Sequence, residues 1–137
     1  MESTQTTPVT ATEKDATSTG KAFVAALADR DFEKLEACLH PEVQFRALIP
    51  PGLRERNGST EAAAQLKAWF SGADRMELLQ QEVYPVSERV HISYRFRNLY
   101  SDGETEVIEQ HAFCDVHEGL IESIDLLCSG FLPETEG

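Results

Sequence analysis

The chain has 137 residues, and its 12 Lys and Arg against 24 Asp and Glu give a net charge of -12. This length fits one domain with a substantial core, and the acidic excess opposes nucleic acid phosphates and anionic lipid headgroups as partners. The sequence has no apolar run of about 18 residues and no basic start followed by an apolar segment, so we predict a cytoplasmic protein without a membrane partner.

Cysteine and histidine positions argue against a metal centre. The three cysteines stand at wide spacings without a CxxC pair, which favours reduced and buried thiols. The four histidines form neither an HxxH nor an HExxH pattern. The sequence also has no P-loop and no GxGxxG motif, so we expect neither a metal nor another cofactor.

The N-terminal half predicts three helices. Residues 1–12 are rich in Thr and Ser and are expected to form a flexible tail, followed by a single domain over residues 13–137. Apolar residues at helical spacing predict a first helix that ends at the polar corner 29–31. Asp31 is expected to cap a short second helix, which His40-Pro41 ends because the residue before proline disfavours the helical conformation.

A strand and a third helix follow. Residues 42–48 alternate apolar and polar side chains, which predicts a half-buried strand, and residues 49–52 (IPPG) predict a lid-like loop after it. Ser59 is expected to cap a helix whose apolar face consists of Ala62, Ala63, Leu66, Trp69 and Phe70.

The rest of the chain reads as four strands, over residues 76–83, 89–100, 105–116 and 120–129. Turn residues at 101–103 (SDG) and 117–119 (HEG) connect the later strands as hairpins. Helices followed by hairpin-linked strands are typical of an α+β fold, in which helices pack on one face of a mostly antiparallel sheet. Such a curved, helix-covered sheet leaves room for a cone-shaped cavity.

Three segments carry a resemblance to a known family: VQFRALIPPG (43–52), AWFSGADRMELL (68–79) and FCDVHEGLIESIDLLCSGF (113–131). With the order of elements over residues 13–132, they resemble the nuclear transport factor 2-like superfamily, and its SnoaL-like branch of small bacterial proteins in particular. The resemblance implies a cystatin-like cone, in which three N-terminal helices pack on a strongly curved, mixed, mostly antiparallel sheet.

The superfamily includes isomerases, dehydratases, epoxide hydrolases, polyketide cyclases and non-catalytic modules, so function depends on the pocket. The ketosteroid isomerase pattern places His111 at its oxyanion-hole aspartate, but puts Ala47 and Phe23 at its other two catalytic positions. Steroid isomerisation is therefore rejected. The arginine and two aspartates of limonene epoxide hydrolases are not evident either, because the matching strand reads Glu109-Gln110-His111.

Strand alternation selects the candidate site. If His111 faces the cavity, Glu109 and Phe113 share its face, while Gln110 points away. We predict His111 as a general acid or base with Glu109 as its partner. The expected pocket is lined by Phe45, Trp69, Tyr94, Phe113, Ile124, Leu126 and Cys128, a set that also describes an ordinary core.

The opposite face of the sheet predicts a homodimer, through an apolar surface of Ala112, Cys114, Leu127 and Phe131. Three hypotheses stay open on the sequence alone. The chain binds a small, largely apolar molecule and catalyses a proton transfer on it, or it is a non-catalytic dimerisation or protein-interaction module, or it is a polyketide cyclase-like enzyme.

Overall fold

A computed structural model describes residues 11–134 of the chain, with side chains from Ala16 onward. The predicted tail lies mostly outside these residues, although Ala11 and Thr12 already belong to the first helix. The helices are α1 (Ala11–Ala28), α2 (Phe32–Ala37) and α3 (Ser59–Phe70). The strands are β2 (Leu39–Ile49), β3 (Gly52–Asn57), β4 (Arg75–Val86), β5 (Arg89–Leu99), β6 (Thr105–His117), β7 (Leu120–Cys128) and β8 (Leu132–Pro133).

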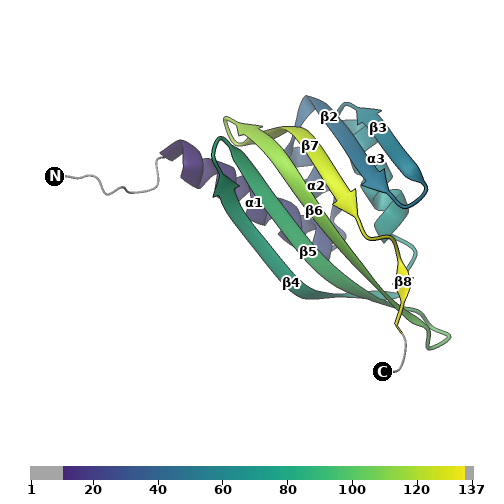
Figure 1. Cartoon of the computed structure of the whole chain (residues 1–137). Helices are drawn as coiled ribbons and strands as arrows, with labels where there is room; N and C mark the ends of the chain where they lie inside the picture. Colours follow the sequence, from purple (N-terminus) through teal and green to yellow (C-terminus); the bar gives the residue numbers. More distant parts are fainter. Residues whose placement is uncertain (1–10, 135–137) are drawn as a thin grey trace.

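The strands of residues 11–134 form one seven-stranded sheet in the order β3-β2-β7-β6-β5-β4, with β8 paired to β6. All paired strands run antiparallel except β2 and β7, which are parallel. The late strand β7 therefore lies between the early strand β2 and its hairpin partner β6 (Figure 1). A mixed, mostly antiparallel sheet with three helices confirms the predicted α+β class.

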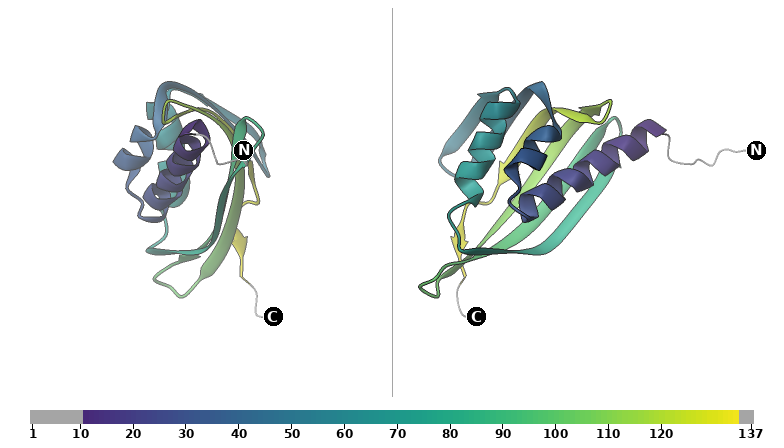
Figure 2. Two further views of the ribbon diagram at one scale, coloured as in Figure 1. Left: turned by 90° about the vertical axis from the view of Figure 1, so that its left-hand side faces the viewer. Right: turned by 180° about the vertical axis from the view of Figure 1, so that it is seen from behind.

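The helices lie together on one side of the curved sheet (Figure 2). Helix α1 packs on β4 and β5, and α3 packs on β2. We call the side facing the helices the inner face, with Phe45, Tyr94, Ala112 and Leu126 as representatives. The opposite side, which no described helix covers, is the outer face, and it presents Arg46, His111 and Leu127 among others.

The corner between α1 and α2 shows how local sequence positions the helices. Arg30 has a φ of 54°, and the side chain of Asp31 accepts a hydrogen bond from the amide of Lys34 at 3.2 Å, as the predicted N-cap requires. The guanidinium of Arg30 donates to the carbonyls of Phe70 and Ala73 at 3.3 and 2.6 Å. These bonds join the end of α1 to the end of α3.

The expected loop after Ile49 is in fact a turn into the edge strand β3, which pairs antiparallel with β2. Residues 53–57 read LRERN and have no apolar face, so hydrophobic periodicity gave no signal for this strand. Two smaller corrections concern helix ends. Leu39 begins β2 rather than ending α2, and the N-cap of α3 is Gly58, with Ser59 as the first helical residue.

A continuous core fills the space between the inner face and the helices. Its largest fully buried side chains are Tyr94, Phe23, Phe45, Phe70, Phe96, Leu27, Leu35, Leu66, Ile92, Ile108, Ile121 and Ile124. Close approach of α1 to the sheet depends on Gly20, where an added Cβ would lie 2.8 Å from Cγ1 of Val83. The helix can pack this tightly because glycine lacks that atom.

Candidate functional site

The predicted site residues divide between the two faces of the sheet. Six of the seven expected pocket residues belong to the core or pack against it: Phe45, Trp69, Tyr94, Ile124, Leu126 and Cys128. His111, Glu109 and Phe113 lie on the outer face, as does Leu127. The expectation that His111 shares a cavity with Ile124, Leu126 and Cys128 is therefore wrong.

A β-bulge in the β6–β7 hairpin explains this difference. Val116 pairs with Ile121, but its neighbour Asp115 pairs with Ser123, which leaves Glu122 as an extra residue on β7. Beyond the bulge, His111 pairs with Leu127. Without the bulge it would pair with residue 126. The one inserted residue therefore places His111 beside the outward-facing Leu127 instead of the inward-facing Leu126.

The predicted dimer surface changes for the same reason. Ala112 and Cys114 are buried on the inner face. Phe131 packs on the inner Phe70, with 6.1 Å between ring centroids. Of the four expected interface residues, Leu127 lies on the outer face, where it is 56% exposed.

A short hydrogen-bonded chain crosses the core beneath the helices. The Tyr94 hydroxyl donates to Oε1 of Gln110 at 2.5 Å, and Nε2 of Gln110 donates to Sγ of Cys128 at 3.2 Å. The amide of Gly130 also donates to this sulfur at 3.3 Å. Gln110 is fully buried, and burial raises the pKa of Tyr94 well above its ordinary value. The Tyr94 hydroxyl therefore acts as a neutral hydrogen-bond donor.

A second chain lies on the outer face and contains the predicted acid-base pair. Nε2 of His111 donates to Oε2 of Glu109 at 2.6 Å, and Nδ1 of His111 lies 3.1 Å from Nε2 of His91. Arg95 donates to the other carboxylate oxygen of Glu109 at 2.7 Å. The expected contact between His111 and Glu109 is thus present, on the side of the sheet away from the helices. Sequence reasoning missed His91 because its strand pairing was not considered.

His91 is almost enclosed, at 5% exposure. Its ring packs against Tyr84 and Phe113, with centroid distances of 4.8 and 4.7 Å. Burial and the neighbouring His111 lower the pKa of His91, against an opposing effect of Glu82. Its Nδ1 atom has no hydrogen-bond partner among the described residues.

Glu109 keeps its charge readily. Hydrogen bonds from His111 and then from Arg95 lower the pKa of Glu109. The carboxylate is therefore ionised throughout the range in which histidine titrates, and it accepts hydrogen bonds from both His111 and Arg95.

Two shallow depressions meet at His111. One, of about 430 Å³, is lined by Arg95, Val107, Glu109, His111, Leu127, Cys128, Ser129 and Leu132. The other, of about 310 Å³, is lined by Arg46, Leu48, Leu53, His111, Phe113, Asp125, Leu126 and Leu127. His111 and Leu127 border both, so they occupy the middle of this surface.

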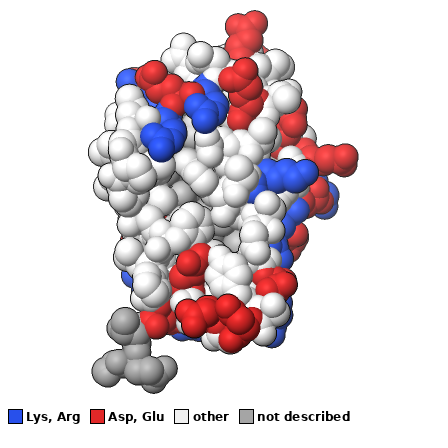
Figure 3. All heavy atoms as spheres, turned by 90° about the vertical axis from the view of Figure 1, so that its right-hand side faces the viewer, with Lys and Arg blue, Asp and Glu red and all other residues white. Residues whose placement is uncertain are grey.

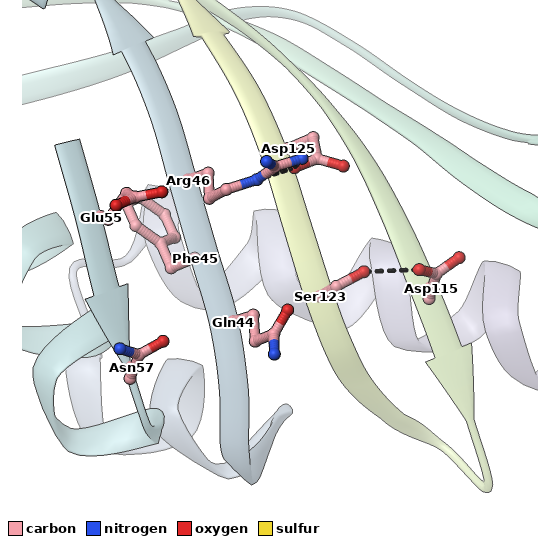
Figure 4. Close-up of a pocket in the computed structure, with 8 residues that line it drawn as sticks. All are labelled: Gln44, Phe45, Arg46, Glu55, Asn57, Asp115, Ser123 and Asp125. Atoms are coloured by element: carbon pink, nitrogen blue, oxygen red, sulfur yellow. Dashed lines mark hydrogen bonds and ion pairs between the residues drawn. The ribbon is translucent and has the colours of Figure 1, made fainter. Parts of the chain in front are cut away.

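A third depression of about 540 Å³ lies further along the outer face and is more polar, lined by Gln44, Phe45, Arg46, Glu55, Asn57, Asp115, Ser123 and Asp125 (Figure 4). Asp125 accepts hydrogen bonds from Arg46 and Arg89, each at 2.9 Å. Ser123 donates to Asp115 at 2.6 Å. Its charged side chains are thus largely committed to one another.

Other site classes find no support in the described part of the chain. Residues 11–134 contain no group of three or more His, Cys, Asp or Glu placed to hold a metal ion. No helix among them has the length and apolar character needed to cross a membrane. On the side that carries β2, β3 and α3, charged groups lie towards the top, the bottom and one border, with uncharged surface between them (Figure 3).

The fold defines a domain of the nuclear transport factor 2-like class. A family model described as a SnoaL-like domain matches residues 21–124. The chain therefore belongs to the SnoaL-like domain family. No curated protein matches it.

Solved structures agree on the fold. A candidate polyketide cyclase from Xanthomonas campestris pv. campestris has a TM-score of 0.68 at 22% identity, covering 84% of this chain and 90% of its own. An epoxide hydrolase of the LEH-like type from M. tuberculosis has a TM-score of 0.67 at 16% identity, covering 85% and 84%. An NTF2-like protein of unknown function from Burkholderia pseudomallei K96243 has a TM-score of 0.64 at 18% identity, covering 82% and 88%. At these identities the likeness concerns the fold alone.

Proposed function

We propose that the protein is a non-catalytic self-association domain, in which two copies of the chain pack through their outer faces. One observation carries the proposal. Seven large apolar side chains on this face are each 39–56% exposed: Leu48, Leu53, Tyr84, Val86, Phe113, Leu127 and Leu132. Apolar patches of ~300–600 Å² are the largest on typical monomers and commonly mark interaction sites.

Charge pairing favours a second copy as the occupant. The chain carries a net charge of -12, which would oppose contact between identical molecules. The arginines of the outer face, however, are paired with carboxylates of the same face, as in Arg46–Asp125 at 2.9 Å and Arg95–Glu109 at 2.7 Å. An apolar centre with a rim of paired charges is the usual anatomy of a protein interface. Two such faces can meet with little repulsion at their centres.

The packed interior also supports a non-catalytic role. Phe45 is fully buried against Trp69, and Tyr94 is fully buried beside Phe96. His111 and Glu109 cannot reach this space from the outer face. The acid-base reaction predicted from the sequence would need a substrate on the surface that the second copy covers.

Sedimentation equilibrium of wild type and Leu127→Glu tests the proposal. We expect twice the chain mass for wild type at neutral pH and a single chain for the variant, because a charge would be buried at the centre of the contact. Leu79→Glu is the matched control. Leu79 is 40% exposed at the bulge of β4, outside the outer-face patch, and its variant should remain dimeric. A monomeric wild type, or a dimeric Leu127→Glu, would overturn the proposal.

A second candidate function is binding of a small, largely apolar molecule on the inner face. The observation that favours it is the Tyr94–Gln110–Cys128 chain, because ligand sites combine apolar walls with a few convergent polar groups. A ligand here would replace core volume, with the partly exposed Trp69 as the side chain that moves. Mass spectrometry of extracts from purified protein tests this, with Gln110→Leu expected to lose the bound molecule and exposed Gln80→Leu to keep it. An empty wild-type extract would contradict it.

A further inference from the structure

His111 occupies the middle of the face assigned above to the second copy. It borders both the 430 Å³ and the 310 Å³ depression, and it pairs across the strands with Leu127. The His111 side chain is 39% exposed in the single chain. A copy that covers Leu127 must therefore also cover His111.

The hydrogen bonds around His111 fix where protons sit when both rings are neutral. Ionised Glu109 accepts from Nε2 of His111, so Nδ1 of His111 is an acceptor. Nε2 of His91 then donates to that Nδ1 at 3.1 Å. In this state the remaining atom, Nδ1 of His91, carries a lone pair and no hydrogen.

An additional proton has no satisfactory place in this arrangement. If His91 takes it, Nδ1 of His91 becomes an N–H group. If His111 takes it, both nitrogens of His111 donate, so His91 must accept at Nε2 and carry its hydrogen on Nδ1. Either way, while the contact holds, an N–H forms at the buried atom that has no partner. A buried donor without an acceptor is unfavourable, so protonation either carries that cost or breaks the contact.

The charged groups around the pair compensate only in part for the added charge, because Glu109, which accepts a hydrogen bond from His111, is shared with Arg95. Arg95 on β5 already pairs with Glu109 at 2.7 Å. Asp125 on β7 and Arg46 on β2 border the neighbouring depression but pair with each other at 2.9 Å. Glu82 on β4 acts to raise the pKa of His91, but Glu82 is exposed, so solvent screens its charge.

Protonation would also disturb the apolar patch. The His91 ring packs between Tyr84 and Phe113, which are both part of that patch. A second copy would enclose the pair further, and enclosure disfavours its charged form. The neutral pair is therefore more stable when the face is covered by a second copy, whereas the protonated pair is more stable when the face is exposed to water.

We propose that the His91–His111 pair makes self-association pH-dependent, so that the two copies separate as the solution is acidified through the histidine range. This inference rests on the self-association proposed above. The sign follows from the burial of the pair. Because contact favours the neutral rings, the dimer is at full strength above the pKa of the pair in the single chain, which for His91 lies below the ordinary histidine value. It weakens as the pH falls below that pKa.

The direction distinguishes this effect from general electrostatics. Acidification reduces the negative charge of both copies, which by itself would strengthen their association. Weakening on acidification therefore points to particular groups rather than to net charge.

The test is the dissociation constant of wild type by sedimentation at about pH 8 and about pH 5.5, at constant ionic strength. A decrease of one pKa unit in the pair on association corresponds to a factor of ~10 per copy, so we expect the dimer to weaken by ~10-fold or more. His111→Gln should associate at least as tightly at about pH 5.5 as at about pH 8, because only the effect of the reduced negative charge remains. His117→Gln, which changes an exposed histidine at the end of β6, should retain the wild-type response.

The outcomes separate the two proposals. A wild type that is monomeric at both pH values overturns the self-association and this inference with it. A dimer of equal strength at both pH values overturns only the inference. Should His111→Gln fail to fold, NMR titration of the imidazole protons replaces it. The two histidines must then titrate at lower pH in the wild-type dimer than in a variant made monomeric by the uncharged change Leu127→Gln, because a glutamate at this position would itself act on the paired His111. Equal values would refute the inference.

Discussion

Tyr94 on β5 and Gln110 on β6 share a hydrogen bond of 2.5 Å inside the core, where both side chains are excluded from water. In Tyr94→Phe, Oε1 of Gln110 would lose its donor while remaining buried. We expect this variant to lose about 1–3 kcal/mol of unfolding free energy, measured by urea denaturation. Tyr84→Phe is the control, because Tyr84 is exposed, and it should change stability by no more than about 0.5 kcal/mol. Equal losses would show that the buried bond does not stabilise the fold.

Gly20 offers a test of helix packing. Replacing glycine by alanine in a helix normally stabilises it by roughly 0.5–1 kcal/mol. At Gly20 the new Cβ would lie 2.8 Å from Cγ1 of Val83, so we expect Gly20→Ala to destabilise the protein by about 1–3 kcal/mol instead. Gly72→Ala meets no atom within 4 Å and should be tolerated. Thermal denaturation of both variants checks the difference, which would vanish if α1 could shift freely.

Asp125 should make part of the stability depend on pH. Burial tends to raise the pKa of Asp125, but hydrogen bonds from Arg89 and Arg46 outweigh it and lower the pKa. A carboxyl group of this kind contributes stability above its unfolded pKa of about 3.9 and loses it as the pH falls through the folded value. With partial exposure, we expect Asp125→Asn to cost about 0.5–1 kcal/mol at pH 7.

The pH profile provides the control for this variant. The difference between wild type and Asp125→Asn should be constant from about pH 5 to 8 and shrink below about pH 4. Glu88→Gln, in the exposed β4–β5 turn, should show no such profile. A difference that persists unchanged in acid would mean that the amide acts through packing rather than charge.

The three cysteines are all free and should differ in reactivity. Cys38 is only partly buried, whereas Cys114 and Cys128 are enclosed in the core. Burial raises the pKa of Cys114 to about 12, which suppresses its thiolate. A thiol reagent should therefore label Cys38 in the native protein and the other two only on unfolding. Cys38→Ser should abolish the native reaction, and a native reaction that survives in it would contradict the burial of the others.

Most of the fold follows from local sequence patterns. Apolar spacing and turn residues located three helices and five long strands, because these elements bury one continuous face. The edge strand β3 was not predicted because Leu53, Glu55 and Asn57 on one side alternate with polar residues on the other. An edge strand with exposed flanks needs no apolar stripe, so hydropathy alone does not indicate it.

The site was harder to predict because facing depends on register. Glu122 is the extra residue of the bulge, and it reverses the partner set expected for His111. A partial signal was present in β6 itself: Ile108, Ala112 and Cys114 share one face of the strand, whereas the polar Glu109, His111 and Asp115 share the other. Gln110 falls in that buried set as its polar member. The contact of His111 with His91 joins residues of two strands and required their pairing to be known.

The position of β7 bears on how the chain assembles. Its neighbours are β2, parallel and far earlier in sequence, and β6, antiparallel and adjacent in sequence. Until residues 120–128 are available, the β2–β3 hairpin has no strand through which to join β4, β5 and β6. Pairing across such a sequence separation is slow, because the chain must lose the entropy of loop closure before the strand contacts stabilise it. During synthesis, the β2–β3 hairpin and the β4–β5–β6 part of the sheet would therefore remain separate, each with an unpaired edge, until β7 pairs with both.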